Sequence, residues 1–171
     1  HAQYHWLGTW AETTYAGLPC MAFGPGDATN RIYAQSGDPI RIGLRWDDIW
    51  GDVKNDFALA LYDEGESLIA AEYLPATGEP DPNRLLSITA GYTGNYDIVI
   101  VRLDSNVTTP TLELFTFDQE LTEYYTSTSS LLVPADAADA LAVGAVPFYN
   151  PVMVESFSSQ GPARDDRLVA G

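Results

Sequence analysis

Cysteine is almost absent from this 171-residue chain, whose one thiol belongs to Cys20. A single thiol cannot form an internal disulfide framework or a metal site built from several cysteines. Free cysteine usually behaves as a small apolar side chain. We therefore expect Cys20 to be a half-buried packing residue.

Basic residues are also scarce, with 8 Lys and Arg against 24 Asp and Glu and a formal net charge of −16. Such a charge repels phosphate backbones and anionic lipid, so we expect neither nucleic acid nor a membrane as a partner. No apolar run approaches the length that crosses a bilayer. The same charge favours solubility and divalent cations.

A signal peptide is the third missing feature, because residues 1–5 lack a basic start and an apolar stretch. If the parent protein is exported, its signal is expected outside this sequence. Little cysteine and lysine, with abundant Thr, Ser, Tyr and Asp, is typical of a secreted, extracellular bacterial protein.

What the chain does have is alternation with a period of two residues. In residues 39–46 the apolar side chains from Ile40 to Trp46 share one face, and Arg41 and Arg45 lie on the other. Further strand-like runs are residues 57–62, 67–73, 85–89, 95–103 and 112–117. Gly, Pro and Asp separate them, which predicts an all-β fold, a jelly-roll-like antiparallel β-sandwich.

The amino-acid composition changes near residue 126, where Thr126 to Ser130 form a polar stretch. We expect a sandwich domain over residues 1–126 and a separate segment over 127–171. Within that segment, short buried strands are expected at residues 131–133, 140–146 and 152–157, and a helix or a turn at 135–140.

Two consecutive motifs in the last 40 residues carry a resemblance to a known family. Residues 140–146 read ALAVGAV, and residues 156–162 read SFSSQGP. This order resembles the subtilisin-like serine proteases, in which these elements precede the motif with the nucleophilic serine. The resemblance implies a C-terminal tail of subtilase-core strands and a parent protein that is a serine endopeptidase acting on a polypeptide substrate.

The first 125 residues resemble another group, the bacterial pre-peptidase C-terminal β-sandwiches. The resemblance rests on residues 45–51 (RWDDIWG), 55–63 (NDFALALYD) and 94–101 (GNYDIVIV). Ala58 and Ala60 depart from it, because the group often has Asp and Tyr there. Some subtilases insert such a sandwich into their catalytic domain, ahead of the serine motif, and the order of elements here is similar.

Serine proteolysis needs a nucleophile, a base and an orienting acid in contact. The family places these residues in D(S/T)G, HGT and GTS(M/F)A contexts, and none of these strings occurs here. We expect His1 and His5 to be surface or packing residues, and Ser156, Ser158 and Ser159 to be structural. The chain is therefore predicted to have no catalytic residues and to be inactive by itself.

One loop has the composition of a metal site. It combines four carboxylates with one amide, namely Asp47, Asp48, Asp52, Asn55 and Asp56. Calcium takes six to eight such oxygen ligands, and close carboxylates repel one another without a cation. The loop therefore predicts either a Ca²⁺ site or a solvated acidic turn whose charges point apart.

Aromatic residues allow a second kind of site, because exposed rings on β-sandwiches stack on sugars. The candidates are Trp46, Trp50, Tyr62, Tyr73 and Tyr92, although Trp46 falls on the apolar face and favours core packing.

Two functions follow from the sequence. In the first, the chain is an accessory domain inserted in a secreted subtilisin-like protease, whose partners are the rest of that catalytic domain and the polypeptide substrate. In the second, it is a stand-alone β-sandwich that binds carbohydrate or protein. In the first case residues 131–162 lack their native neighbours in this chain, whereas a binding module would hold them in its own core.

Overall fold

A computed structural model describes residues 2–74, 81–106, 108–130 and 143–161. The described chain is almost entirely β, with one short 3₁₀ helix, η1 (Ala2–Tyr4). The strands of the described residues are β1 (His5–Thr9), β2 (Glu12–Tyr15), β3 (Leu18–Met21), β4 (Asn30–Ala34), β5 (Pro39–Trp46), β6 (Phe57–Asp63), β7 (Leu68–Glu72), β8 (Asn83–Thr89), β9 (Gly94–Arg102) and β10 (Thr111–Thr116).

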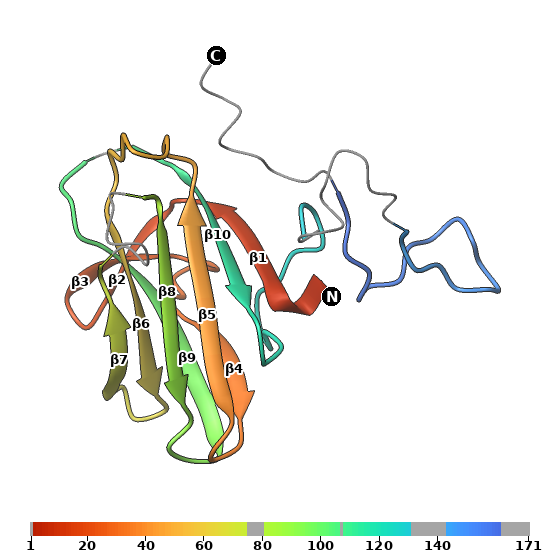
Figure 1. The fold of residues 1–171 in the computed structure, drawn as a ribbon, viewed down its shortest axis with the longest axis horizontal. Helices are drawn as coiled ribbons and strands as arrows, with labels where there is room; N and C mark the ends of the chain where they lie inside the picture. Colours follow the sequence, from red (N-terminus) through yellow and green to blue (C-terminus); the bar gives the residue numbers. More distant parts are fainter. Residues whose placement is uncertain (1, 75–80, 107, 131–142, 162–171) are drawn as a thin grey trace.

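These strands form two antiparallel sheets that pack face to face, which confirms the predicted β-sandwich (Figure 1). The four-stranded sheet has the order β1-β10-β5-β8. The six-stranded sheet has the order β2-β3-β9-β6-β7, and β4 also pairs with β9. Neighbours such as β10 and β5 are far apart in the chain, so most pairing is between distant segments.

The core lies between the sheets and follows the predicted alternation. On β5, Ile40, Ile42, Leu44 and Trp46 are all at most 2% exposed, whereas Arg41 points outward. Trp46 is therefore a core residue, as expected, and its ring packs edge-on against Phe57 of β6 at 5.2 Å between centroids. Cys20 is fully buried, deeper than the half-buried position expected for it.

The chain after β10 stays attached to the sandwich as far as residue 130. Leu121 bridges to Ile32 of β4 and is 1% exposed. The backbone N–H of Thr126 donates to the carbonyl of His5 at 2.8 Å. The strands lie within the predicted sandwich range of 1–126, although the exact boundary stays a prediction.

The tail differs from its prediction. Residues 143–161 form turns and no strand (Figure 1). Their last part returns to the sandwich, because Phe157 accepts from the backbone N–H of Ala2, and Gln160 bonds the backbone of Ser127 and Ser130, each at 3.0 Å. Several apolar side chains of the segment are exposed, with Phe148 at 97%, Val152 at 91% and Val143 at 84%. The strand expected at 152–157 and the described part of the strand expected at 140–146 do not form, and no neighbouring strand pairs with either. The other tail elements expected at residues 131–142 lie outside the described residues.

Candidate functional site

The acidic loop joins β5 to β6 at one end of the sandwich, and Asp48 organises it. Its carboxylate accepts hydrogen bonds from the backbone N–H groups of Lys54 at 2.8 Å and Asn55 at 2.6 Å. The side-chain N–H groups of Trp46 at 3.1 Å and Asn55 at 2.8 Å also donate to it. Protein donors therefore stabilise the charge of Asp48 and close the loop.

The other predicted calcium ligands point to different partners. Asp52 forms an exposed ion pair with Lys54 at 2.5 Å, and Asp56 pairs with the buried Arg84 at 2.5 Å. Asp47 is exposed. The structure thus brings Asp48 and Asn55 together and separates the rest. No group of three or more His, Cys, Asp or Glu among the described residues could hold a metal, so calcium binding stays a prediction.

Asn55 lies next to a positively charged side chain, that of Arg102. Its side-chain oxygen accepts from the guanidinium of Arg102 at 3.3 Å and from the hydroxyl of Thr108. Arg102 is 5% exposed and lies over the rings of Trp10 and Phe57 at 4.6 and 5.1 Å. Cation–π contact and backbone carbonyls stabilise this buried charge. Sequence reasoning missed it because Arg102 lies 47 residues from Asn55.

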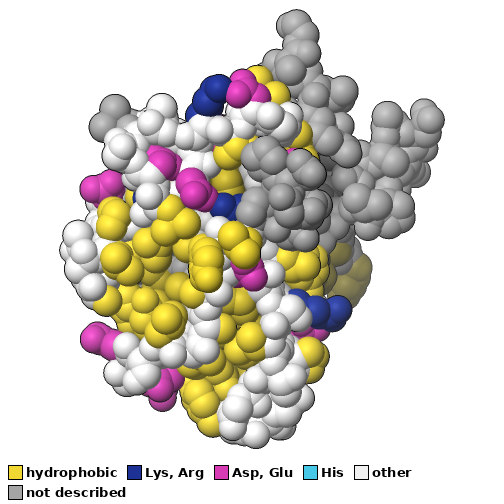
Figure 2. All heavy atoms as spheres, turned by 60° about the vertical axis from the view of Figure 1, so that its left-hand side comes forward, with side chains coloured by type: hydrophobic (Ala, Val, Ile, Leu, Met, Phe, Trp, Pro, Cys, Tyr) yellow, Lys and Arg dark blue, Asp and Glu magenta, His cyan; other side chains and the backbone are white. Residues whose placement is uncertain are grey.

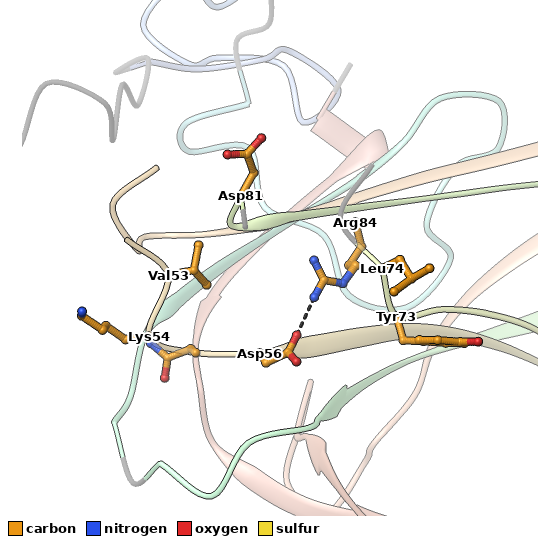
Figure 3. Close-up of a pocket in the computed structure, with 8 residues that line it drawn as sticks. Val53, Lys54, Asp56, Tyr73, Leu74, Asp81 and Arg84 are labelled. Atoms are coloured by element: carbon orange, nitrogen blue, oxygen red, sulfur yellow. Dashed lines mark hydrogen bonds and ion pairs between the residues drawn. The ribbon is translucent and has the colours of Figure 1, made fainter. Parts of the chain in front are cut away.

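A pocket of about 350 Å³ opens beside this loop (Figure 3). It is lined by Val53, Lys54, Asn55, Asp56, Tyr73, Leu74, Asp81 and Arg84. Arg84 is 4% exposed, lies 5.1 Å from the ring of Trp46, and has an Nε atom without a hydrogen-bond partner in the described structure. Burial lowers the pKa of Arg84, and the charge of Asp56 opposes that effect.

The pocket combines polar and apolar side chains. Tyr73 is 60% exposed and lies at its margin, with its ring directed away from Asp56 and Arg84 (Figure 3). Of the other aromatic candidates, Trp50 is 42% exposed, Tyr62 is 7% exposed, and Tyr92 is partly buried and stacked on Tyr96 at 4.5 Å. Tyr73 is the one that combines exposure with a pocket.

A histidine, a carboxylate and a hydroxyl meet elsewhere, between β1, β10 and residue 126. The ring of His5 lies 2.9 Å from a carboxylate oxygen of Glu113 and 3.2 Å from the hydroxyl of Thr126. However, its Nδ1 is closer to the backbone carbonyl of Thr126, at 2.9 Å, than to the hydroxyl. The carbonyl and the hydroxyl therefore share this nitrogen, and no hydroxyl is held by the imidazole alone.

The surroundings of His5 also indicate a structural role. His5 and Glu113 are 1% and 2% exposed, and Arg45 holds the second oxygen of Glu113. Burial favours the neutral acid, but hydrogen bonds from His5 and Arg45 outweigh it and hold the pKa of Glu113 below its ordinary value. The group is a buried ion network that joins the first strand to the end of the sandwich, consistent with the packing role expected for His5.

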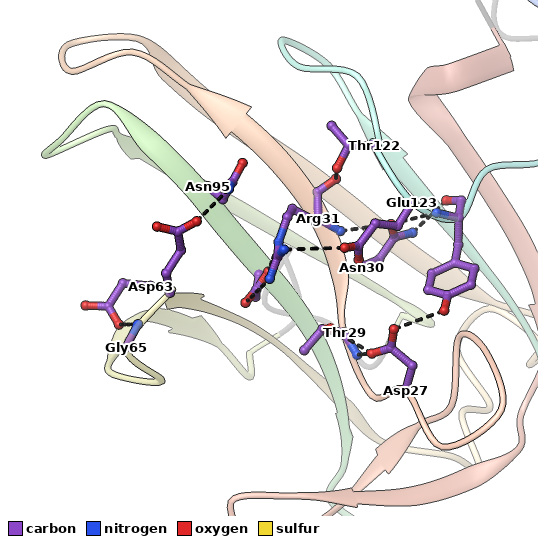
Figure 4. A network of polar contacts seen from close by, with 12 residues as sticks. Asp27, Thr29, Asn30, Arg31, Asp63, Gly65, Asn95, Thr122 and Glu123 are labelled. Carbon is purple, nitrogen blue, oxygen red and sulfur yellow. Dashed lines mark hydrogen bonds and ion pairs between the residues drawn. The ribbon is translucent and has the colours of Figure 1, made fainter.

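A second polar network fixes the segment that follows β10 (Figure 4). The side-chain N–H of Asn30 donates to the carbonyl of Tyr124 at 2.7 Å, and its side-chain oxygen accepts from the backbone N–H of Tyr124 at 3.2 Å. Arg31 forms a two-point ion pair with Asp97 of β9 and lies 3.5 Å from Glu123. The hydroxyl of Tyr124 donates to Asp27 at 3.0 Å. These contacts explain why residues 121–126 keep a defined path without being a strand.

The three serines of the tail have the ordinary contacts of turn residues. The buried Ser158 accepts from the backbone N–H of Ala145 at 3.0 Å and donates to the carbonyl of Ser159 at 3.3 Å. Ser156 is exposed. Among the described residues, no hydrogen bond joins these hydroxyls to an imidazole.

Comparison with known proteins gives one informative result. No protein-family model and no curated protein matches the chain. Among solved structures, the chain is similar to the Clostridium perfringens CspB protease, with a TM-score of 0.62 and 13% sequence identity. The match covers 97% of this chain and 37% of that protease, so the chain spans about a third of its length. At this identity the likeness concerns the fold alone.

No helix in the part of the chain that the structure describes combines the length and apolar character needed to cross a membrane.

Proposed function

We propose that this chain is an accessory β-sandwich of a secreted, subtilisin-like serine endopeptidase, and that residues 127–171 belong to its catalytic domain. The accessory domain packs on that catalytic domain, stabilises it and shapes the access of the polypeptide substrate. It contributes no catalytic residue. Its partners are the rest of the protease and the substrate.

The observation that carries this proposal is the exposure of the tail. Phe148, Tyr149 and Val152 are 97%, 76% and 91% exposed within a few residues of one another. Contiguous exposed apolar side chains mark surfaces that other protein covers. A self-contained binding module would bury them in its own core, whereas a segment of a catalytic domain meets its neighbours elsewhere in the parent protein. The SFSSQGP motif lies next to this exposed stretch.

The fold likeness supports the proposal in a second way. The similarity to a solved protease covers 97% of this chain, so it extends over the sandwich and into the tail. This favours an accessory domain over a sandwich with an unrelated linker.

The coding sequence on either side of this chain tests the proposal. We expect D(S/T)G and HGT motifs upstream and a GTS motif shortly downstream. Flanking sequence without these three motifs would reject it.

The inactivity of the chain alone is tested separately with a fluorogenic peptide and a fluorophosphonate probe. We expect no turnover and no labelling. Stoichiometric, saturable labelling of one serine would contradict the prediction.

A carbohydrate-binding module is the second candidate, and the pocket at Tyr73 favours it. An exposed ring at the margin of the pocket can stack on a sugar, and Asp56, Asp81 and Arg84, which line the same pocket, can bond the hydroxyl groups of that sugar. Glycan-array binding that Tyr73→Ala abolishes would support it. Uniformly negative arrays would remove it.

A further inference from the structure

The six-stranded sheet is apolar on both faces along its strand β6. Along β6, Phe57, Leu59 and Leu61 enter the core between the sheets, while Ala58 and Ala60 belong to a second apolar cluster on the outer face. Every residue from 57 to 62 is buried. A sheet that borders water on one side normally alternates apolar and polar side chains. The outer face therefore has the composition of a covered surface.

This outer face contains a groove of about 260 Å³ (Figure 2). Small buried residues line its floor, including Ala58, Ala60 and Val101. Its walls are exposed apolar side chains, among them Leu18 at 44%, Leu103 at 48% and Tyr73 at 60%. The groove is hollow because alanines occupy the strand that forms its centre.

The size of the groove fits one or two side chains. Pockets for whole small molecules measure about 300–1,000 Å³, so this groove is smaller than most of them. It follows β6 from Leu103 at one end to Tyr62 and Leu68 at the other. An extended segment rises about 3.4 Å per residue, so a few residues of a polypeptide would cover its length.

One end of the groove is acidic. Asp63, Glu64 and Glu66 form the turn that joins Tyr62 to Leu68. At the other end Asp104 follows Leu103, but its side chain is only 17% exposed and accepts hydrogen bonds from the backbone N–H groups of Asp56 and Asn106. Figure 2 shows acidic side chains at the margin of the apolar face. Burial raises the pKa of Tyr15, which packs edge-on against Tyr62, and the charges of Glu66 and Asp97 raise it further.

Charge decides between the possible occupants. A second copy would bring another net charge of −16 against this acidic turn, and like charges oppose association. A segment that combines apolar side chains with neighbouring Lys or Arg would match the groove in shape and in charge.

We propose that the outer groove of the six-stranded sheet binds an extended polypeptide segment whose apolar residues are flanked by lysine or arginine. The apolar side chains enter the groove over Ala58 and Ala60, and the basic side chains face the acidic turn between β6 and β7. This inference is independent of the protease assignment, because it uses the surface of the sandwich alone.

Three labelled peptides test it by fluorescence anisotropy on the full chain. The first has a Leu-Ala-Leu centre between pairs of lysines, the second replaces lysine by glutamate, and the third replaces leucine by serine. We expect saturable binding of the first, with a Kd below about 1 mM, and no binding of the others. Binding of the first should weaken in high salt, because exposed charges are screened.

The chain offers a matched pair of variants. Leu103 and Leu85 are both 48% exposed, but Leu103 lies in the groove wall and Leu85 on β8 of the four-stranded sheet. Leu103→Ser should weaken binding about tenfold, and Leu85→Ser should leave it unchanged. Circular dichroism checks that both variants fold.

Several results would overturn the proposal. They are the absence of saturation, equal binding of the three peptides, or an equal effect of the two variants. A dimer in sedimentation that Leu103→Ser dissociates would also overturn it, because a second copy would then be the occupant.

Discussion

The sandwich and the tail use the same kinds of side chain with opposite results. Phe57 on β6 is fully buried, and Phe148 in the tail is 97% exposed. Val99 on β9 is fully buried, and Val152 is 91% exposed. The difference lies in strand pairing: β6 and β9 each have antiparallel neighbours, and residues 143–161 have none. Apolar composition by itself does not create a core.

The difference between the two regions is tested most directly by replacing one phenylalanine in each by alanine. Phe57→Ala should lower the free energy of unfolding by about 3–5 kcal/mol, because it removes a large buried ring and leaves a cavity. Phe148→Ala is the matched control and should change it by less than about 0.5 kcal/mol. Urea denaturation measures both. A large loss for Phe148→Ala would mean that the tail has a packed core of its own.

Six strands of the sandwich could be predicted from the sequence, and four could not. The strands from β5 to β10 have clear alternation or long apolar runs, such as FALALY in β6. The strands from β1 to β4 have four or five residues each. β2 has a polar sequence and β3 contains Pro19, so neither has a local strand signal. β3 pairs with the distant β9, and β2 pairs with β3 across a two-residue connection.

The candidate site, too, could be predicted only in part from the sequence. Composition identified the loop of Asp47, Asp48, Asp52, Asn55 and Asp56, but it could not identify the partners of these residues. Arg84 lies 28 residues from Asp56, and the carbonyl that meets His5 lies 121 residues away. Local charge density suggests repulsion, and the structure relieves it with Arg84 of β8, with Lys54 and with N–H donors of Trp46, Lys54 and Asn55.

The next prediction concerns the junction where the sandwich ends and the tail begins. Glu113→Gln removes the charge that His5 and Arg45 share, and it should lower the free energy of unfolding at pH 7 by about 2–3 kcal/mol. Because the pKa of Glu113 is lower in the folded state, its stabilisation is present above the ordinary carboxyl pKa. That stabilisation should be lost as the pH falls below about 4.

Urea denaturation between pH 7 and pH 3 checks this, and the variant should show a flatter pH dependence than the unmodified chain. Asp118→Asn is the control, because its partner Arg41 is 54% exposed. Exposed pairs contribute less than about 1 kcal/mol. If Glu113→Gln and Asp118→Asn cost the same, the buried network does not stabilise the junction.

The smallest expected effect concerns the acidic loop between β5 and β6, which is ordered by hydrogen bonds and not by an apolar core. Asp48→Ala removes the acceptor of four N–H groups and should lower the free energy of unfolding by about 1–2 kcal/mol. Asp47→Ala, at an exposed neighbour, should change it by less than about 0.5 kcal/mol. Thermal unfolding in EGTA measures both effects, since the hydrogen bonds need no metal.

Repeating the scans in millimolar calcium then tests the metal prediction, because a ligand that binds the folded state raises its stability. A calcium-dependent rise that Asp47→Ala removes would support a Ca²⁺ site, and identical scans in calcium and EGTA would reject it.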